Sequence, residues 1–441
     1  MAYSSGVPPS EGMTYQTAVD TLAALQPQTI RPGLDRIKAM LAELAHPEAT
    51  FKIIQVAGTN GKGSTGAMVA AILQSAGCRV GLYTSPHLCS VRERIRVNRV
   101  PISREEFAEG IHKLLPLAQT IAPTYFEVLT ALGLHYFARR EVEWAVLEVG
   151  MGGRWDATTV GSPLASVITP IDFDHQAYLG WRLEEIAAEK AAIIRSGVAV
   201  SAAQAPAVEE VIKKRSELLG VQLLIEGREL SIAVRHQDPS GHRLDLKGPD
   251  WELPDLALPL LGLFQPTNCL LAVGAVRALR SSVTVSDKAI REGVRTVRWP
   301  GRFQLLQEEP YLVVDSAHNP AGARALAHSL RTHFPRQAIT LILGIYKDKD
   351  KAQILETLTP LADRIILTAS SHPRAASPDE LRGLVPSTHA EILVISNILD
   401  ALTLALTPPT TPVICVAGSL SLVAEALEWF HAQGPDIPCE V

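Results

Sequence analysis

The sequence predicts an α/β protein with an N-terminal doubly wound parallel sheet, a small antiparallel annex, and a smaller C-terminal α/β domain of the Rossmann type. Three observations support this fold class. Short apolar runs alternate with helical patterns along most of the chain, as in parallel sheets whose strands are joined by helices. A glycine-rich segment stands between the first such run and the helix after it. The alternation stops at Trp299-Pro300-Gly301-Arg302 and then starts again, so we predict two domains, residues 1–298 and 299–441.

Length and composition indicate a protein of several ordinary domains that binds small molecules. The chain has 441 residues, of which 47% are hydrophobic, and this length exceeds what one core usually serves. The formal charge is −5, from 41 basic and 46 acidic residues, so no excess of positive charge is present to hold nucleic acid. No apolar run reaches the ~18 residues of a membrane helix, and no signal peptide is recognisable at the start. We therefore expect a cytoplasmic monomer with no membrane or nucleic-acid partner.

Five cysteines without a C-x-x-C pair argue against a disulfide framework and against a zinc knuckle. A reducing compartment agrees with this count.

Each element follows from its local pattern. Helical spacing between residues 14 and 44 is interrupted from 26 to 33, which predicts two helices around a loop. The first domain is then predicted to contain strand 53–56, helix 65–76, strand 80–84, helices 104–119 and 124–140, strands 144–149 and 165–169, helix 182–195, strand 198–202, and helices 267–279 and 286–297. Short alternating runs between residues 227 and 258 predict the annex. The second domain is predicted to contain strand 312–315, helix 321–333, strands 339–344, 365–368 and 413–417, and helix 420–431.

The segment Val56-Ala57-Gly58-Thr59-Asn60-Gly61-Lys62-Gly63-Ser64, called the phosphate loop below, joins the first strand to the first helix of the sheet. Glycines let successive backbone N–H groups converge on an anion, the helix start adds positive charge, and a lysine reaches the outer phosphates. The usual spacing puts a glycine six residues before the lysine, where this chain has Val56. A plain glycine-rich turn is the alternative. The flanking strand and helix favour a nucleotide triphosphate site.

Polar side chains follow several strands of the predicted sheet. Ser64, Ser85, Glu148 and His175 come shortly after four of them, and ligands of such sheets bind at the carboxyl ends of the strands. A hydroxyl, a carboxylate and an imidazole at one edge suit a magnesium ion that also touches phosphates. Taken singly, Glu148 also fits a solvent-facing strand end, and His175 fits a hydrogen-bonded structural histidine.

Lys190 is expected on a buried helix face, because its neighbours three and four residues away are Ile186, Ala187, Ile193 and Ile194. One interpretation is a lysine whose stem packs while its amine reaches water. The other is a functional lysine whose amine is paired or modified, since a bare buried ammonium is costly.

A second polar cluster follows the domain break. Arg302 and the segment Asp315-Ser316-Ala317-His318-Asn319-Pro320 would face the nucleotide edge of the first domain if the two domains meet across a cleft. For Asp315 the alternative is a helix-capping role.

The chain resembles the folylpolyglutamate synthase and dihydrofolate synthase family, a branch of the Mur-type amide ligases, over nearly its whole length. The matching stretches are residues 58–64, 84–88, 93–96, Phe126-Glu127, 148–158, Asp174-His175, 189–191, Leu261-Gly262 with Gln265 and Asn268, 300–302, Asp315 with 317–320, and 348–350. The phosphate loop of this family looks like G-T-N-G-K-G-S, which explains the unusual lysine spacing.

The resemblance implies the following site. ATP is expected at Gly58, Asn60, Gly61, Lys62, Gly63, Ser64, Asn268, Arg302, Asp315 and His318. Magnesium, as two ions, is expected at Ser64, Ser85, Glu148, His175 and Lys190, the last carbamylated. The pterin-containing substrate is expected at Thr29, Ile30, Arg31, Pro32, Thr124, Phe126, Glu127, Arg154 and Asp156. The catalytic residues are expected to be Lys62, Lys190, His175 and Arg302.

Two positions depart from the family pattern. Phe264 stands where the family usually has histidine, and Ser316 stands where it usually has glycine. Neither touches the phosphate loop or the magnesium positions, so the resemblance implies an active enzyme.

The implied activity is ATP-dependent joining of L-glutamate to dihydropteroate, to the glutamate tail of reduced folates, or to both, through an acyl phosphate. Two alternatives are another Mur-type amino-acid ligase and a nucleotide-binding regulatory module that ligates nothing. Against the first, only about fifty residues precede the phosphate loop, too few for the separate substrate domain of the peptidoglycan ligases. Production of ADP that depends on both glutamate and a pteroate would separate the enzyme from the second.

Overall fold

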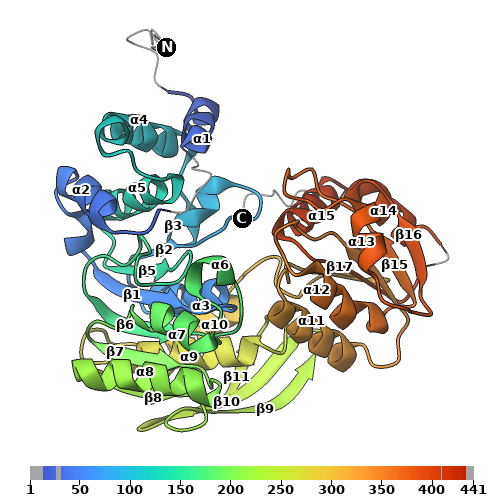
Figure 1. Ribbon diagram of the computed structural model, residues 1–441. Helices are drawn as coiled ribbons and strands as arrows, with labels where there is room; N and C mark the ends of the chain where they lie inside the picture. The colour runs from blue at the N-terminus through green and yellow to red at the C-terminus, as the bar shows by residue number, and fades with distance from the viewer. Residues whose placement is uncertain (1–12, 26–30, 409, 434–441) are drawn as a thin grey trace, which may run out of the picture.

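The computed structural model describes residues 13–25, 31–408 and 410–433. It contains an eight-stranded sheet, a three-stranded sheet and a six-stranded sheet. Figure 1 shows the eight-stranded sheet with its helices and the six-stranded sheet with its helices as two α/β units lying next to each other. The predicted fold class is confirmed. Among the described residues no helix has the length and apolar character needed to span a membrane.

The first unit is organised around the eight-stranded sheet. Its strands, in sheet order, are β4 (Val100–Pro101), β3 (Ile95–Val97), β2 (Val80–Tyr83), β5 (Trp144–Glu148), β1 (Lys52–Ala57), β6 (Pro163–Ile168), β7 (Val198–Ser201) and β8 (Gln222–Ile225). All neighbours pair in parallel except β2 with β3 and β3 with β4, which are antiparallel. Strand β5 is buried along its whole length, as expected for a parallel strand covered on both faces.

Helices cover both faces of this sheet. One face packs against α3 (Lys62–Ser75), α9 (Gln265–Ala278) and α10 (Asp287–Thr296). The other packs against α1 (Tyr15–Ala24), α2 (Asp35–Glu43), α4 (Arg104–Ile121), α5 (Tyr125–Arg139), α7 (Leu183–Ala191) and α8 (Pro206–Leu219). Short helices η1 (Pro47–Ala49), η2 (Val91–Arg94) and α6 (Gln176–Leu179) lie in the connections. Successive strand residues alternate between these cores, as the pleat requires.

The predicted annex is the three-stranded antiparallel sheet of β9 (Ser231–Asp238), β10 (Gly241–Gly248) and β11 (Trp251–Leu258). Its buried leucines belong to the same core as α3 and α9. The annex is therefore packed on the first unit.

The second unit is a six-stranded sheet in the order β12 (Gln304–Glu308), β13 (Tyr311–Asp315), β17 (Val413–Ala417), β14 (Ile339–Leu343), β15 (Arg364–Leu367) and β16 (Glu391–Val394). Only β12 pairs antiparallel. Helices α11 (Pro320–His333), α12 (Lys351–Leu358) and α13 (Pro378–Leu384) cover one face, and α14 (Ile398–Leu406) and α15 (Leu420–Gln433) cover the other; η3 (Thr359–Leu361) follows α12.

Most differences between the predicted elements and the structure are helices and strands that were not predicted. The helix predicted over 182–195 ends at Ala191, and residues 192 and 193 continue as a turn rather than a helix. Not predicted were η1–η3, α6, α8, α12, α13, α14, β3, β4, β8, β12 and β16. Most of these lie at sheet edges or on exposed faces, where the apolar pattern is weakest. The domain boundary at 298 and 299 stays a prediction.

The two units meet on an apolar side and a polar side. On the apolar side, Leu261 and Phe264 pack against the core of the second unit, and the Leu263 amide donates to Ser329 Oγ at 3.1 Å. On the polar side, hydrogen bonds and ion pairs join the phosphate loop and the segment after β6 to the second unit. The polar side coincides with the predicted site.

Candidate active site

The phosphate loop has a backbone that only glycine suits at two positions. Gly58 has φ +148° and Gly61 has φ +91°, both in the region that side chains disfavour. A Cβ on Gly58 would lie 1.8 Å from Thr169 Oγ1, and one on Gly61 would lie 2.3 Å from Asn268 Oδ1. Gly61 is also the N-cap of α3, so the amides at the start of this helix face the loop. This is the geometry of an anion site at a helix N-terminus.

Helix α9 supports the phosphate loop through side chains at its start. Ser64 is buried, and its hydroxyl accepts a hydrogen bond from Gln265 Nε2 at 3.4 Å. Asn268 Nδ2 donates to Gln265 Oε1 at 3.0 Å. The chain thus brings Asn268, predicted to bind ATP, to within contact of Gly61.

Lys62 is the centre on which the predicted first-unit residues converge. Its ammonium donates to the Thr59 carbonyl at 3.2 Å. Its charge contributes to the pKa values of Glu148, His175 and Lys190. Side chains that follow β1, β5 and β6 in the chain therefore surround a single ammonium, as the sheet-edge argument predicted.

Glu148 is a buried carboxylate at the end of β5. Burial raises its pKa, while the Lys62 charge, the Ser85 amide and the Arg302 charge oppose the rise. The Ser85 amide donates to Glu148 Oε2 at 3.1 Å. Because burial still dominates, the ionised carboxylate is short of positive charge in the protein alone. A cation beside it would offset this deficit.

Lys190 is 5% exposed, which confirms the burial predicted from its helical spacing. Its Nζ donates to the Gly58 carbonyl of the phosphate loop at 2.8 Å. Burial, and then the nearby Lys62 charge, lower the pKa of Lys190 to about 7. The interpretation in which the amine reaches water is therefore wrong.

His175 stands just before α6 in a left-handed conformation with φ +52°. Burial lowers its pKa to about 4, although the neighbouring Asp174 carboxylate opposes the change. Its ring is neutral at pH 7 and so has a nitrogen lone pair available for a metal. Among the described residues no group of three or more His, Cys, Asp or Glu side chains is arranged as a metal site, so the predicted set depends on hydroxyl and modified-lysine oxygens as well.

Asp174 ties the site to the second unit. It accepts hydrogen bonds from Lys349 Nζ and from Asn319 Nδ2, each at 2.9 Å. Burial opposes ionisation, but in the acid range where Asp174 titrates His175 is protonated, and its charge together with that of Lys349 holds the pKa of Asp174 below its usual range. The side-chain amides of Asn319 and Asn60 also exchange hydrogen bonds at 3.2 Å.

Arg302 lies between the two sheets. Its charge acts on Glu148 of the first unit and on Asp315 and His318 of the second. The carboxylate of Asp315 accepts the amides of Phe303 and Ala317, each at 2.7 Å, and burial raises its pKa to about 6. Burial lowers the pKa of His318 to about 4, and the charges of Lys349 and Arg302 act in the same direction. Arg302 therefore acts on groups of both units, and its predicted role across a cleft stays a prediction.

Ser316 and Phe264, the two residues that depart from the family pattern, both make defined contacts. The Ser316 hydroxyl donates to the Gly301 carbonyl at 2.8 Å, beside a second bond from its own amide at 3.0 Å. It therefore steadies the residue before Arg302. The Phe264 ring packs over Gly262 and against the core of the second unit. Hydrophobic packing takes the place of whatever a histidine would supply there.

The predicted pterin segment at the start of α5 is tightly organised. Thr124 and Glu127 form a capping box, and Arg36 Nε donates to Glu127 Oε2 at 3.0 Å. The Phe126 ring meets the Tyr83 ring edge to face at 6.0 Å between centroids. A Cβ on Gly150 would lie 2.7 Å from the Phe126 ring. An aromatic face next to a glycine loop suits a flat heterocycle.

The glycine loop after β5 is held by Asp156. Its carboxylate accepts the amides of Gly150, Met151 and Thr158, each at 3.0 Å, and the Thr158 hydroxyl at 2.6 Å. Burial raises its pKa. Arg154, by contrast, points to the surface and pairs with Glu189 at 2.8 Å.

The remaining predicted substrate residues are only partly described. Thr29 and Ile30 lie outside the described residues. Arg31 donates to the Ala122 carbonyl at 3.1 Å, close to the start of α5, and Pro32 is exposed. The substrate roles of these residues, and of Arg154 and Asp156, stay predictions.

Asp156→Ala is expected to lower the free energy of unfolding by about 3 kcal/mol, because at least three backbone amides lose a buried acceptor. Urea denaturation measures the change. Glu210→Ala on the exposed face of α8 is the control, because it removes only an exposed ion pair with Lys214, and the change should be within about 0.5 kcal/mol. Equal stability of the two variants would show that the loop does not depend on this carboxylate.

Three residues of the site were quoted only as parts of matching stretches and given no role: Asp174, Asn319 and Lys349. Their importance lies in hydrogen bonds across the unit boundary. Asn319 precedes Pro320 and accepts from the Gly322 amide, so its helix-capping pattern was visible in the sequence. Its hydrogen bonds with Asn60 and Asp174 could not be predicted from the sequence.

Comparison with known proteins agrees with this arrangement. Residues 56–276 match the Mur ligase middle domain, and residues 301–420 match the Mur ligase glutamate ligase domain. The dihydrofolate synthase/folylpolyglutamate synthase of Bacillus subtilis is 36% identical over 362 residues, covering 80% of this chain and 84% of that protein. The protein of the same name from Mycobacterium tuberculosis is 37% identical over 379 residues, covering 80% and 78%.

Solved structures show the same likeness. Folylpolyglutamate synthase of Mycobacterium tuberculosis, complexed with ADP and AMPPCP, superposes with a TM-score of 0.88 at 34% identity, covering 96% of this chain and 100% of that one. Escherichia coli FolC in complex with DHPP and ADP gives a TM-score of 0.86 at 30% identity, covering 95% and 98%. With both Mur ligase domains matched and with relatives at this identity over most of their length, the chain belongs to the dihydrofolate synthase/folylpolyglutamate synthase family of Mur-type ligases.

Proposed function

We propose that this protein is an ATP-dependent ligase that joins L-glutamate to dihydropteroate and to the glutamate tail of reduced folates. The observation that carries the proposal is the convergence of Lys62 and Arg302, from two different units, on the buried carboxylate of Glu148. Such a site can hold the triphosphate of one substrate against the carboxylate of another.

The chemistry requires activation of a carboxylate. The γ-phosphoryl group of ATP is transferred to the carboxylate oxygen, which gives an acyl phosphate and ADP. The amine of glutamate then attacks the acyl carbon, loses a proton, and releases phosphate. No step needs a covalent bond to the protein. The residues act by position and charge.

Individual residues are assigned by their surroundings. The amides of the phosphate loop and Lys62 hold the β- and γ-phosphates, with the Gly61 and Asn268 contact fixing the loop. Arg302 neutralises charge on the transferred phosphoryl group. Asp315 and His318 are proposed to contact the nucleotide from the second unit, and the face of Phe126 is proposed to hold the pterin ring.

Magnesium fits the residues present. The buried carboxylate of Glu148 lacks enough positive charge, His175 is neutral, and Ser64 carries a hydroxyl at the start of α3. Together with Ser85 these groups would hold one ion, and a carbamylated Lys190 would contribute to a second. Bound magnesium would neutralise phosphate charge and orient the triphosphate.

The expected result of a substrate panel is glutamate addition to both dihydropteroate and reduced folate monoglutamate. The physical reason is that one pterin segment, around Phe126, serves both substrates, which share the ring and differ in the tail. Product mass after incubation with ATP and labelled glutamate measures the addition. Addition to folates alone would remove the dihydropteroate half of the proposal, and ADP formation without any amide product would favour a regulatory module.

A further inference from the structure

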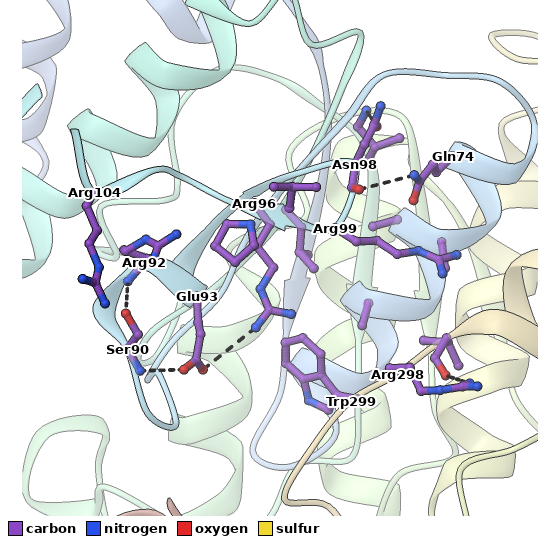
Figure 2. Close-up of a pocket in the computed structure, with 18 residues that line it drawn as sticks. Gln74, Ser90, Arg92, Glu93, Arg96, Asn98, Arg99, Arg104, Arg298 and Trp299 are labelled. Atoms are coloured by element: carbon purple, nitrogen blue, oxygen red, sulfur yellow. Dashed lines mark hydrogen bonds and ion pairs between the residues drawn. The ribbon is translucent and has the colours of Figure 1, made fainter. Parts of the chain in front are cut away.

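A cavity of about 530 Å³ lies outside the site described above, on the α3 face of the sheet next to its β3–β4 edge. It is bounded by helix α3, by strands β2 to β4, by the first residue of α4, and by the linker residues that lead to Arg302. Figure 2 shows the side chains that surround it.

The cavity combines an apolar floor with a rim of arginines. The floor is formed by small residues of α3, by Val80 and Leu82 of β2, and by the indole of Trp299. Five arginines, called the rim below, also line the cavity: Arg92, Arg96, Arg99, Arg104 and Arg298. In Figure 2, Arg92 and Arg104 lie on one side, Arg99 and Arg298 on the other, and Arg96 between them above Trp299.

Among the described residues that line the cavity, arginines outnumber carboxylates five to one, while Glu292 acts on Arg99 from outside the cavity. One carboxylate, Glu93, lines the cavity, and it lies 3.9 Å from Arg96 Nη2. Its two oxygens already accept three backbone amides at the start of η2. Arg99 instead donates to the carbonyl and hydroxyl of Thr296, which are neutral acceptors.

Arg96 is the strongest indication of a missing anion. It is only 6% exposed, and its guanidinium lies over the Trp299 ring at 5.4 Å. Its Nε is buried and has no hydrogen-bond acceptor among the described residues. A buried cation that is paired only at long range is costly, and an anion in the cavity would offset that cost.

We propose that this cavity binds an organic anion with a flat or apolar body and two or more carboxylate or phosphate groups. Guanidinium groups recognise both kinds of oxyanion in bidentate fashion, while the apolar floor accepts the body of the ligand. Nucleotides and oligoglutamyl pteroates are two sources of this chemistry. The proposal concerns a second ligand and goes beyond ligation.

The position of Trp299 connects this second site with the first. A Cβ on Gly63 of the phosphate loop would lie 2.7 Å from the Trp299 ring, and Trp299 stands three residues before Arg302. A ligand that fixes the indole therefore restrains the phosphate loop and the linker at once. Occupancy of the cavity is expected to alter nucleotide affinity at the first site.

The test measures binding, so its outcome does not depend on ligation. The full-length protein is saturated with β,γ-methylene ATP to fill the first site, and calorimetry follows titration with ADP, pteroyl-tri-γ-glutamate or pyrophosphate. At least one of the first two probes is expected to bind wild type, and to bind Arg99→Gln/Arg298→Gln about tenfold more weakly or worse. Both arginines are exposed. The control Arg243→Gln, in an exposed ion pair on the annex, should bind like wild type.

The probes also identify the source of the ligand. Because the segment around Phe126 is itself proposed to bind the pterin, only binding that Arg99→Gln/Arg298→Gln weakens is counted for the cavity. Weakened binding of ADP alone assigns the cavity to nucleotides, and weakened binding of the pteroate alone assigns it to folates. Pyrophosphate alone would overturn the apolar part of the proposal. If no probe distinguishes wild type from the double variant, the cavity is not an anion site. Should the double variant have a lowered melting temperature, Arg104→Gln on another part of the rim serves as the second variant, with the same expected loss.

Discussion

Lys190→Ala is expected to lower kcat for glutamate ligation by about a hundredfold or more, with little loss of stability. The buried amine donates to the Gly58 carbonyl and has a pKa lowered to about 7, so a large fraction is neutral at physiological pH. A neutral amine adds to carbon dioxide, losing a proton, and the resulting carbamate offers two anionic oxygens that suit a hard cation. Steady-state kinetics measures the loss.

Control and rescue distinguish this role from packing. Lys213→Ala, which removes an ion pair on the surface of α8, should leave kcat unchanged. Short-chain carboxylates such as acetate should partly restore Lys190→Ala, because they supply the missing oxygens. Full activity of Lys190→Ala, together with unmodified Lys190 in a nucleotide-bound crystal, would leave a lysine that only packs.

The pKa of Lys190 also predicts how stability depends on pH. The folded-state pKa, about 7, lies below the ordinary value of 10.5, so between these pH values the unfolded chain binds more protons. The contribution of unmodified Lys190 to the free energy of unfolding therefore increases as pH rises from about 7 towards 10.5. The difference in free energy of unfolding between wild type and Lys190→Met, measured in urea at pH 7 and at pH 9, gives this contribution. A difference that is constant with pH would contradict the lowered pKa.

Arg302→Ala is expected to reduce kcat by about a hundredfold to a thousandfold while the fold is kept, because a charge aimed at the transferred phosphoryl group is lost. Arg302 acts on groups of both units, Glu148 in one and Asp315 in the other. Its removal should also reduce the ATP-induced change in how the two units are arranged. Turnover and ATP-induced change in the radius of gyration are the two readouts.

Arg324→Ala is the matched control for Arg302. Arg324 also joins the two units, through an ion pair with Asp172 at 2.6 Å, but it is 52% exposed. An exposed pair contributes little, so this variant should retain kcat within about threefold. Similar losses in both variants would assign the effect to contact between the units rather than to chemistry.

The sequence alone was sufficient to predict those features that depend on a single local pattern. The strand, glycine loop and helix around Lys62 are such a case, because Gly58 and Gly61 are required there by local backbone geometry. Burial of Lys190 is another, since its apolar neighbours three and four residues away determine the face. The annex likewise followed from short alternating runs with polar breaks between residues 227 and 258.

Other features depend on contacts between distant segments. Asn60 and Asn319 are 259 residues apart, and neither local sequence indicates that their amides meet. The distribution of charge is also not visible in the sequence, because Arg302 acts on Glu148 and Lys62 lies near it only once the chain is folded and both units are assembled. The rim of arginines around Trp299 was missed because it joins the stretch 92–104 to the distant residue Arg298, in a chain whose net charge is negative.

The unequal sides of the boundary between the units have a mechanical consequence. Leu261 and Phe264 anchor one side in a hydrophobic core, and separating them would expose apolar surface to water. The opposite side is held by hydrogen bonds and an ion pair among Asn60, Asn319, Asp174 and Lys349, and these polar groups regain hydration when the units separate. We therefore expect the two units to move by rotation about the apolar side, which would open and close the space between the phosphate loop and Arg302.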